Sequence, residues 1–177
     1  MSKDFNDKVI IVTGASSPKG IGAETARRFA EEGAKAIVIT SRQQSENSAQ
    51  SVVAILKKQG CEALWIPGDI TDPEVPRKII QLTRSTFGRL DVLVNNAGAK
   101  IDKPINAISA FDWDIVLNTN LRAAYLMIRE SISAFSKNDG GAIVNVSSIV
   151  GLYGNTGQAN YSAAKAGIVG LTRSAAI

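Results

Sequence analysis

A tyrosine and a lysine stand four positions apart in the segment "NYSAAKAG", near the end of the 177-residue chain. On a helix, Tyr161 and Lys165 would share one face, because residues at i and i+4 are neighbours there. A phenol beside an ammonium group is suited to donating a proton to a reacting carbonyl oxygen, since the positive charge favours the phenolate left behind. An amphipathic surface turn can carry the same pair, so the pair needs support from other residues.

The absence of one residue type narrows the possible chemistry. The chain has no histidine and one cysteine, Cys61. Ser-His-Asp and Cys-His mechanisms are thereby excluded, as are the usual zinc sites, and we expect no metal centre. Proton transfer near neutral pH is left to Asp, Glu, Lys, Tyr, Cys or water.

A glycine-rich loop, "TGASSPKGIG", separates an apolar β-branched run from an amphipathic helical segment. In that position glycines let the backbone approach a pyrophosphate, and the helix N-terminus offers free N–H groups. A tight turn without a ligand would use glycine as well, but the strand–loop–helix context favours a nucleotide. The cofactor-binding residues expected in this loop are Gly14, Ser16, Lys19, Gly20, Ile21 and Gly22.

The segment "VITSRQQ" bears on the choice of nucleotide. An acidic residue about 20 positions after the loop would bind the ribose hydroxyls of NAD. Ser41 and Arg42 stand there instead, and a guanidinium group matches the geometry of a 2′-phosphate. Lys19 could add a second positive charge, so we predict NADP(H); the alternative is that both cations are merely solvated.

Apolar runs alternate with amphipathic segments along the whole chain. Strands are predicted near residues 8–15, 35–41, 61–71, 89–98 and 140–151, and helices near 22–34, 46–60, 73–88, 109–137 and from about 158. The strands are apolar nearly throughout, which is typical of a parallel sheet buried on both faces. This order predicts one α/β domain over residues 1–177, a doubly wound parallel sheet.

Composition sets limits on partners and location. The net charge is +4 without a conspicuous Lys/Arg cluster, which argues against nucleic acid. The first residues, "MSKDFNDK", lack a signal-peptide core, and no apolar run is long enough for a membrane span. With a single cysteine, we expect a reducing, cytoplasmic location.

Six segments together resemble the short-chain dehydrogenase/reductase family: "TGASSPKGIG", "GDIT", "NNAG", "NTNL", "VSS" and "YSAAK". They occur in the family's order and near its spacing. Within the family, "GNTGQANYSAAKAG" is most similar to the 3-oxoacyl-[acyl carrier protein] reductases. The resemblance implies a Rossmann-like fold, an NADP(H)-dependent ketone reductase and a homo-oligomer. It also implies a ketone or acyl-thioester substrate, including one carried on acyl carrier protein.

The resemblance also implies roles for individual residues. The catalytic set would be Asn120, Ser148, Tyr161 and Lys165, with Lys165 also holding the nicotinamide ribose. Further cofactor contacts would come from Asp69, Ile70, Asn96, Ala97 and Gly98, together with Tyr161 and Lys165. Spacing from the tyrosine selects Ser148 over Ser147, and Asn118 is a near-miss alternative to Asn120.

Two departures from the family pattern leave alternatives open. The loop has a wider spacing than usual between Gly14 and Gly20, and the sequence ends at Ile177, before the family's C-terminal strands and substrate lid. We therefore expect a bare fifth strand, weak NADPH binding and poor activity from this chain alone. The alternative functions are a catalytically silent nucleotide-binding fragment and an oligomerisation module.

Overall fold

The computed structural model describes residues 4–135 and 140–177, and strands alternate with helices along them. The strands are β1 (Val9–Thr13), β2 (Ala36–Ser41), β3 (Glu62–Pro67), β4 (Val92–Asn95) and β5 (Ala142–Asn145). The α-helices are α1 (Ile21–Glu31), α2 (Glu46–Lys58), α3 (Glu74–Phe87), α4 (Ala110–Leu117), α5 (Ala123–Phe135), α6 (Val150–Tyr153) and α7 (Ala159–Ala175). Shorter turns are η1 (Gln43–Ser45), η2 (Ile105–Ala107) and η3 (Asn118–Arg122).

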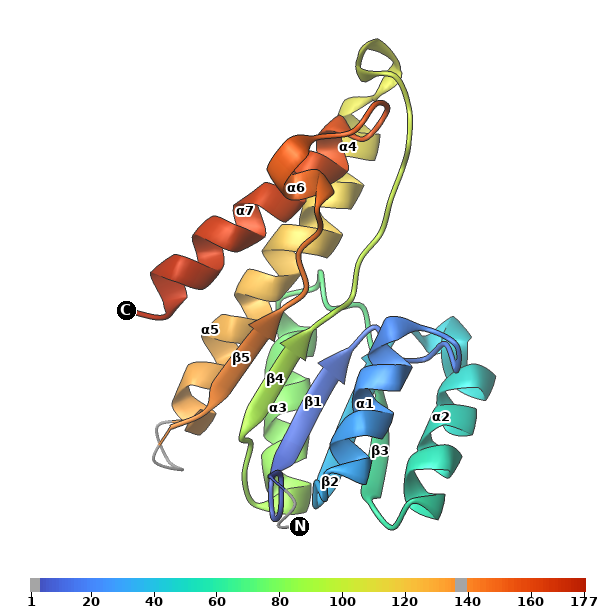
Figure 1. The fold of residues 1–177 in the computed structure, drawn as a ribbon, viewed down its shortest axis with the longest axis vertical. Coiled ribbons are helices and arrows are strands. Elements are labelled where there is room, and N and C mark those ends of the chain that lie inside the picture. The colour runs from blue at the N-terminus through green and yellow to red at the C-terminus, as the bar shows by residue number, and fades with distance from the viewer. Residues whose placement is uncertain (1–3, 136–139) are drawn as a thin grey trace.

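The five strands form one sheet in the order β3-β2-β1-β4-β5, and all neighbours are parallel (Figure 1). In β1, Ile11 is paired with Val38 of β2 on one side and Leu93 of β4 on the other. The chain thus moves outward on one side of β1, then returns and moves outward on the other. The predicted doubly wound sheet is confirmed, with its switch point at the carboxyl ends of β1 and β4.

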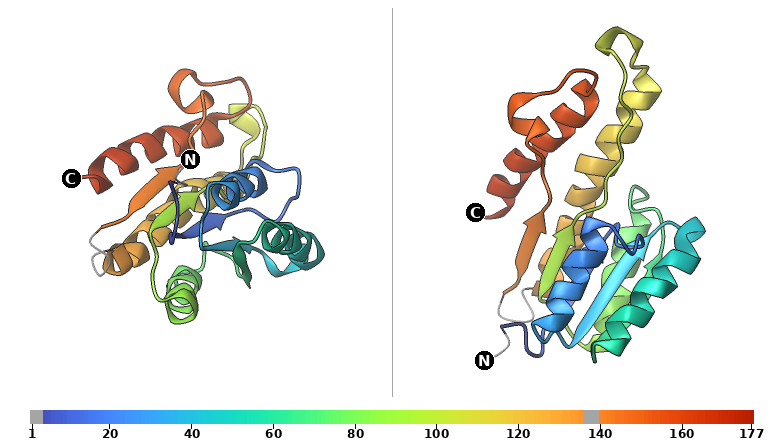
Figure 2. Two further views of the ribbon diagram at one scale, coloured as in Figure 1. Left: turned by 60° about the horizontal axis from the view of Figure 1, so that its bottom comes forward. Right: turned by 45° about the vertical axis from the view of Figure 1, so that its right-hand side comes forward.

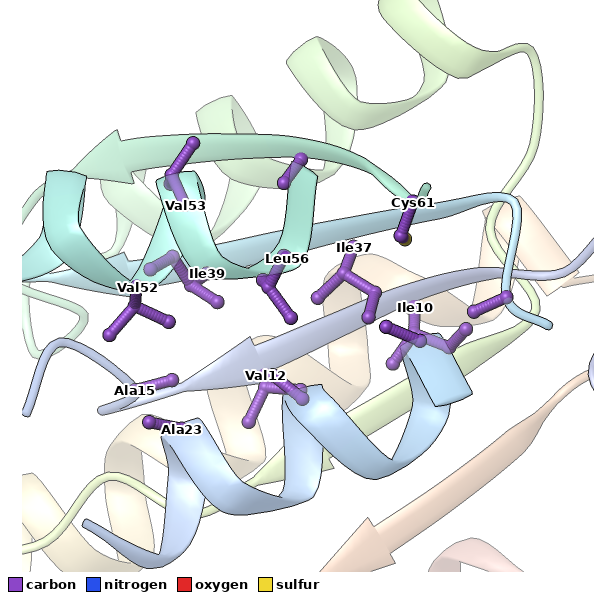
Figure 3. Close-up of a cluster of buried hydrophobic side chains, with 14 of the residues drawn as sticks. Ile10, Val12, Ala15, Ala23, Ile37, Ile39, Val52, Val53, Leu56 and Cys61 are labelled. Carbon is purple, nitrogen blue, oxygen red and sulfur yellow. The ribbon is translucent and has the colours of Figure 1, made fainter. Parts of the chain in front are cut away.

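Alternate side chains of β1 enter two separate hydrophobic layers, since strand side chains point to opposite faces in turn. Ile10 and Val12 pack into the cluster beneath α1 and α2 shown in Figure 3. Ile11 joins the cluster formed with α3 and α5, to which Leu171 of α7 adds an edge. Figure 2 shows these helices layered about the sheet. Burial on both faces explains why the central strands are continuous apolar runs.

The fifth strand departs from the general prediction of strands buried on both faces, and it agrees with the bare edge expected for this strand in particular. Val144 is 48% exposed, whereas its neighbour across the ladder, Val94, is 2% exposed. Within the described residues, β5 pairs with β4 alone and forms the edge of the sheet. The helix on that face, α1, packs over β1 and β2 nearer the centre, so it does not cover Val144.

The long helix predicted over residues 109–137 is interrupted. A π-helical turn, η3, separates α4 from α5, and the N–H of Ala123 donates to the carbonyl of Asn118, five residues earlier. The predicted end at residue 137 lies outside the described residues. Single π turns within α-helices are frequent at functional sites, and η3 contains Asn120.

The described ranges, 4–135 and 140–177, contain neither a helix that could span a membrane nor a cluster of metal-ligating side chains. No helix there has the length and apolar character needed to cross a membrane. No group of three or more His, Cys, Asp or Glu side chains is arranged to hold a metal ion there.

Candidate active site

A cavity of about 360 Å³ opens at the carboxyl ends of the strands, as expected for a doubly wound sheet. Its size falls within the usual range of ligand pockets, roughly 300–1,000 Å³. It is lined by Gly14, Ser16, Thr40, Ser41, Arg42, Ser45, Gly68, Asp69, Ile70, Asn96, Ala97, Gly98, Ala99, Ile115 and Thr119. Nine of the residues predicted to bind the cofactor are among them, and they come from four different loops.

The ends of β1 and β4 are joined by polar contacts at the cavity floor. The hydroxyl of Thr13 accepts from the N–H groups of Asn96 and Ala97, both at 3.0 Å. The amide of Asn96 donates back to the carbonyl oxygens of Thr13 (2.9 Å) and Gly14 (3.2 Å). Gly14 has φ +66°, and a Cβ there would lie 2.6 Å from the Cα of Ala97. Only glycine allows these two loops to approach so closely.

The rim of the cavity, formed by the chain after β2 and β3, carries the side chains that would distinguish NADP from NAD. Arg42 is exposed, and the hydroxyl of Ser41 accepts from the indole N–H of Trp65 at 3.0 Å. An accepting hydroxyl still carries a proton to donate. The carboxylate of Asp69 accepts from the N–H and hydroxyl of Thr71, so it fixes its own turn at the rim.

Four predicted loop residues do not line this cavity. Lys19, Gly20 and Ile21 border a different hollow of about 560 Å³, which they share with Phe5 and Phe29 on the outer side of α1. Gly22 is buried in the first turn of α1. The structure therefore places Lys19 and Arg42 in different hollows, whereas we expected them to act together on one phosphate.

The predicted acid and its partner lie together on α7. The Lys165 Nζ is 5.7 Å from the centroid of the Tyr161 ring. Lys165 is only 4% exposed, and its Nζ donates to the carbonyl of Val146 at 2.7 Å. Burial lowers the pKa of Lys165, because removal from water disfavours the ammonium form. The carbonyl contact compensates part of that loss of hydration.

Asn120 presents an unused acceptor beside this lysine. It is 2% exposed, and its Nδ2 donates to the carbonyls of Val116 (2.8 Å) and Ala99 (2.7 Å). Its Oδ1 is buried and has no hydrogen-bond partner among the described residues. A Cβ added to Gly98 would lie 2.7 Å from that Oδ1 and 3.9 Å from the Lys165 Nζ. The glycine thus keeps open the space between Asn120 and Lys165.

The two adjacent serines after β5 have different contacts. The hydroxyl of Ser147 donates to the backbone carbonyl of Lys165 at 2.8 Å, which ties β5 to α7. The hydroxyl of Ser148 accepts from the N–H of Val150 at 3.3 Å and keeps its own proton for another acceptor. This arrangement supports Ser148, rather than Ser147, as the substrate-facing serine.

Sequence reasoning missed several residues of the site. Thr40 lines the cavity with a buried hydroxyl that lacks a partner among the described residues. Ile115 and Thr119 enter the cavity from α4 and η3. The position of Thr13, immediately before the first glycine at a strand end, was a usable indication. The sequence position of Ile115 gave no such indication, because its place in the cavity depends on how α4 lies across the sheet.

A parallel doubly wound sheet, a glycine-rich loop at its switch point and a cavity above the strand ends together define a Rossmann-like dinucleotide-binding domain. The sequence profile of the short chain dehydrogenase family matches residues 8–177. The chain therefore belongs to the short chain dehydrogenase family, a family of oxidoreductases that use a nicotinamide cofactor.

Relatives agree with this assignment. The chain is 41% identical over 169 residues to a 3-oxoacyl-[acyl-carrier-protein] reductase of Staphylococcus aureus, covering 96% of this chain and 67% of that one. It is 38% identical to an enzyme of the same name from Synechocystis, with the same two coverages. A structure of NAD⁺-bound xylitol dehydrogenase superposes with a TM-score of 0.92 at 32% identity, over 98% of this chain and 65% of that one. The chain thus spans about two thirds of the length of these relatives.

Proposed function

We propose that this protein is an NADPH-dependent oxidoreductase that reduces a ketone to a hydroxyl group. The observation that carries the proposal is the buried Lys165 beside the Tyr161 ring. Across Gly98 from this lysine lies the Oδ1 of Asn120, which has no hydrogen-bond partner among the described residues. Burying an ammonium group and an unsatisfied amide oxygen costs stability. Their presence side by side therefore indicates a functional role, because it contributes little to folding.

The described residues fit a nicotinamide dinucleotide. The cavity has the size of a ligand pocket, and Thr40 and Asn120 each present a buried oxygen without a partner among the described residues. Arg42 and Ser41 stand at the rim, where donors to a 2′-phosphate are needed. Such a cofactor supplies a hydride for the carbonyl carbon when it is bound.

The residues of the chain would handle the proton and the developing charge. Tyr161 would donate its phenolic proton to the carbonyl oxygen as that oxygen becomes an alkoxide. Ser148 would donate a hydrogen bond to the same oxygen, and Lys165 would stabilise the phenolate electrostatically. Asn120 would accept a hydrogen bond, direct or through water, from the ammonium of Lys165.

A 3-oxoacyl thioester is the substrate class that we favour. The reductases from Staphylococcus aureus and Synechocystis are named for such substrates on acyl carrier protein. Directly after Ser148, three large apolar side chains are well exposed: Ile149 (65%), Leu152 (64%) and Tyr153 (82%). An apolar surface beside the reacting serine suits the chain of an acyl group. We also expect a homo-oligomer and a cytoplasmic location, as the sequence suggested.

The test is turnover of a short 3-ketoacyl thioester by the purified protein with NADPH, compared with NADH. We expect detectable oxidation of NADPH with formation of the 3-hydroxy product, and weaker use of NADH. Tyr161→Phe should lower this turnover sharply, and the matched control Tyr125→Phe, which removes an exposed phenol on α5, should leave it unchanged. NADPH binding without turnover would instead favour the catalytically silent nucleotide-binding alternative.

A further inference from the structure

The loop that follows β4 is tied to two elements that carry predicted catalytic residues, η3 and α7. Near its start, the carbonyl of Ala99 accepts from the side-chain amide of Asn120 at 2.7 Å. Two residues later, the carbonyl of Ile101 accepts from the side-chain amide of Asn160 at 3.2 Å. One short stretch of backbone therefore fixes the π turn on one side and the start of α7 on the other.

Gln158, the residue that caps the N-terminus of α7, makes the next contact along this loop. It is 8% exposed, and its Nε2 donates to a carboxylate oxygen of Asp102 at 3.0 Å. Its Oε1 accepts from the amide of Asn155 at 3.0 Å, so the side chain is held at both ends. Its backbone carbonyl accepts from the N–H of Ser162 at 2.7 Å, in the first turn of α7.

Further contacts continue the link on both sides of Gln158. The N–H of Lys103 donates to the carbonyl of Gly157 at 2.9 Å. Asn160 is fully buried, and its Oδ1 accepts from the backbone N–H of Tyr161 at 2.8 Å. The same Asn160 side chain therefore contacts the loop through its amide and the catalytic residue through its oxygen.

Directional contacts are needed here because apolar packing alone does not fix the helix start. In the first two turns of α7 the buried side chains are Asn160, Ala164 and Lys165, of which Ala164 alone is apolar, and Tyr161 itself is only partly buried. Apolar burial is non-directional, whereas hydrogen bonds constrain both distance and angle. The helix start that carries the acid is thus held by a set of polar contacts to a single loop.

We propose that Gln158 and Asp102 are positioning residues. They hold the start of α7 against the loop after β4, so that Tyr161 keeps its position relative to Asn120. This inference rests on the proposed function, since it assigns the pair a role in that reaction. Neither side chain needs to touch the substrate or the cofactor. The pair acts through Tyr161, so its loss should lower kcat more than it weakens NADPH binding.

The pair permits a test by reversal of polarity. Gln158→Glu would set two carboxylates against each other where an amide now donates at 3.0 Å. We expect kcat to fall about tenfold to a hundredfold, since a displacement of about 1 Å can cost that much. Asp102→Asn keeps a donor facing an acceptor and should be nearly neutral. The double variant restores a charged hydrogen bond with donor and acceptor exchanged, and it should recover most of the lost kcat.

A surface glutamine provides the matched control. Gln59 also donates to a carboxylate, that of Glu31, but at 3.4 Å and on the exposed side of the molecule. Gln59→Glu creates the same repulsion away from the site and should leave kcat unchanged. If Gln158→Glu kept full activity, or if its loss were not rescued by Asp102→Asn, the positioning role would be wrong.

A second readout separates this inference from the proposed function. Amide hydrogen exchange over residues 159–165 reports the order of the helix start whether or not the protein turns over a ketone. We expect faster exchange there in Gln158→Glu and recovery in the double variant, with exchange in β1 unchanged. Absence of turnover in the unmodified protein would overturn the proposed function alone. Unchanged exchange in Gln158→Glu would overturn the positioning inference.

Discussion

The two sides of the sheet are built by different means. On the side of β1 and β2, strand residues such as Val9, Ile11 and Ile37 are fully buried between α1, α2 and the helices of the other face. On the side of β5, Val144 is 48% exposed, and side-chain hydrogen bonds link α7 to the loop after β4 and to Ser147. The core beneath the nucleotide site is held mainly by apolar packing, whereas the start of α7, which carries Tyr161, is held mainly by directional polar contacts.

This difference predicts which kind of damage a substitution causes. Changes near the cavity floor should lower the free energy of unfolding, because they disturb a packed core. Changes around α7 should lower turnover first, because they disturb orientation more than burial. The variants below test that division, beginning with the largest expected effect.

Tyr161→Phe should lower kcat by about 10²- to 10⁴-fold, the usual contribution of a positioned general acid. The ring remains beside Lys165, so the dissociation constant for NADPH should hardly change. Steady-state kinetics and a fluorescence titration of NADPH measure the two quantities separately. Near-normal turnover by this variant would require another source of the proton.

Arg42→Asp should reverse the cofactor preference. Loss of a charge-assisted hydrogen bond and gain of repulsion should weaken NADPH binding by about tenfold to a hundredfold, with little effect on NADH. Lys19→Asp sharpens the comparison, because Lys19 lies in the other hollow. We expect Lys19→Asp to weaken NADPH binding much less than Arg42→Asp does. Equal losses of affinity would show that Lys19 also contacts the 2′-phosphate.

Gly14→Ala should destabilise the core beneath the nucleotide site. A side chain at φ +66° is strained, and its Cβ would lie 2.6 Å from the Cα of Ala97. We expect a loss of about 2 kcal/mol or more in the free energy of unfolding, measured by denaturant titration. Gly170→Ala is the control, because it lies in α7 with open space around it, and it should stabilise the protein by about 0.5–1 kcal/mol. Equal effects would contradict the packing argument.

The smallest expected effect is a pH dependence of stability that comes from Lys165. Its pKa is lowered by burial, so the charged form is less favourable in the folded than in the unfolded protein. The resulting penalty is present at low pH and is relieved as pH rises through the lowered pKa towards the ordinary value of 10.5. Lys165→Met removes this dependence. The stability difference between wild type and variant should therefore shift in favour of wild type over that range, and a constant difference would contradict it.

Much of the fold could be predicted because it follows from local patterns. Apolar runs ending at glycines predicted the order of the strands, and β1 begins one residue after the predicted start. The end predicted for the fifth strand, at residue 151, was wrong, because β5 ends at Asn145 and residue 151 lies in α6. The spacing of Tyr161 and Lys165 predicted their shared helix face, which the structure confirms.

What could not be predicted depends on tertiary contacts. The π turn that contains Asn120 arises from a hydrogen bond shifted to Asn118 and from side-chain contacts to Ala99 and Val116. The placement of Lys19 and Arg42 at different hollows depends on the path of the glycine-rich loop. Roles in cofactor binding remain predictions for the loop residues.

The most direct test of the account is isotope transfer, which detects even slow turnover. The protein is incubated with a short 3-ketoacyl thioester and NADPH that carries deuterium at the transferable position of the nicotinamide, and the product is analysed by mass spectrometry. We predict a 3-hydroxyacyl thioester with deuterium at the new alcohol carbon, formed at least about a hundredfold more slowly by Tyr161→Phe. Absence of labelled product from the unmodified protein, or equal labelling by the variant, would contradict the account.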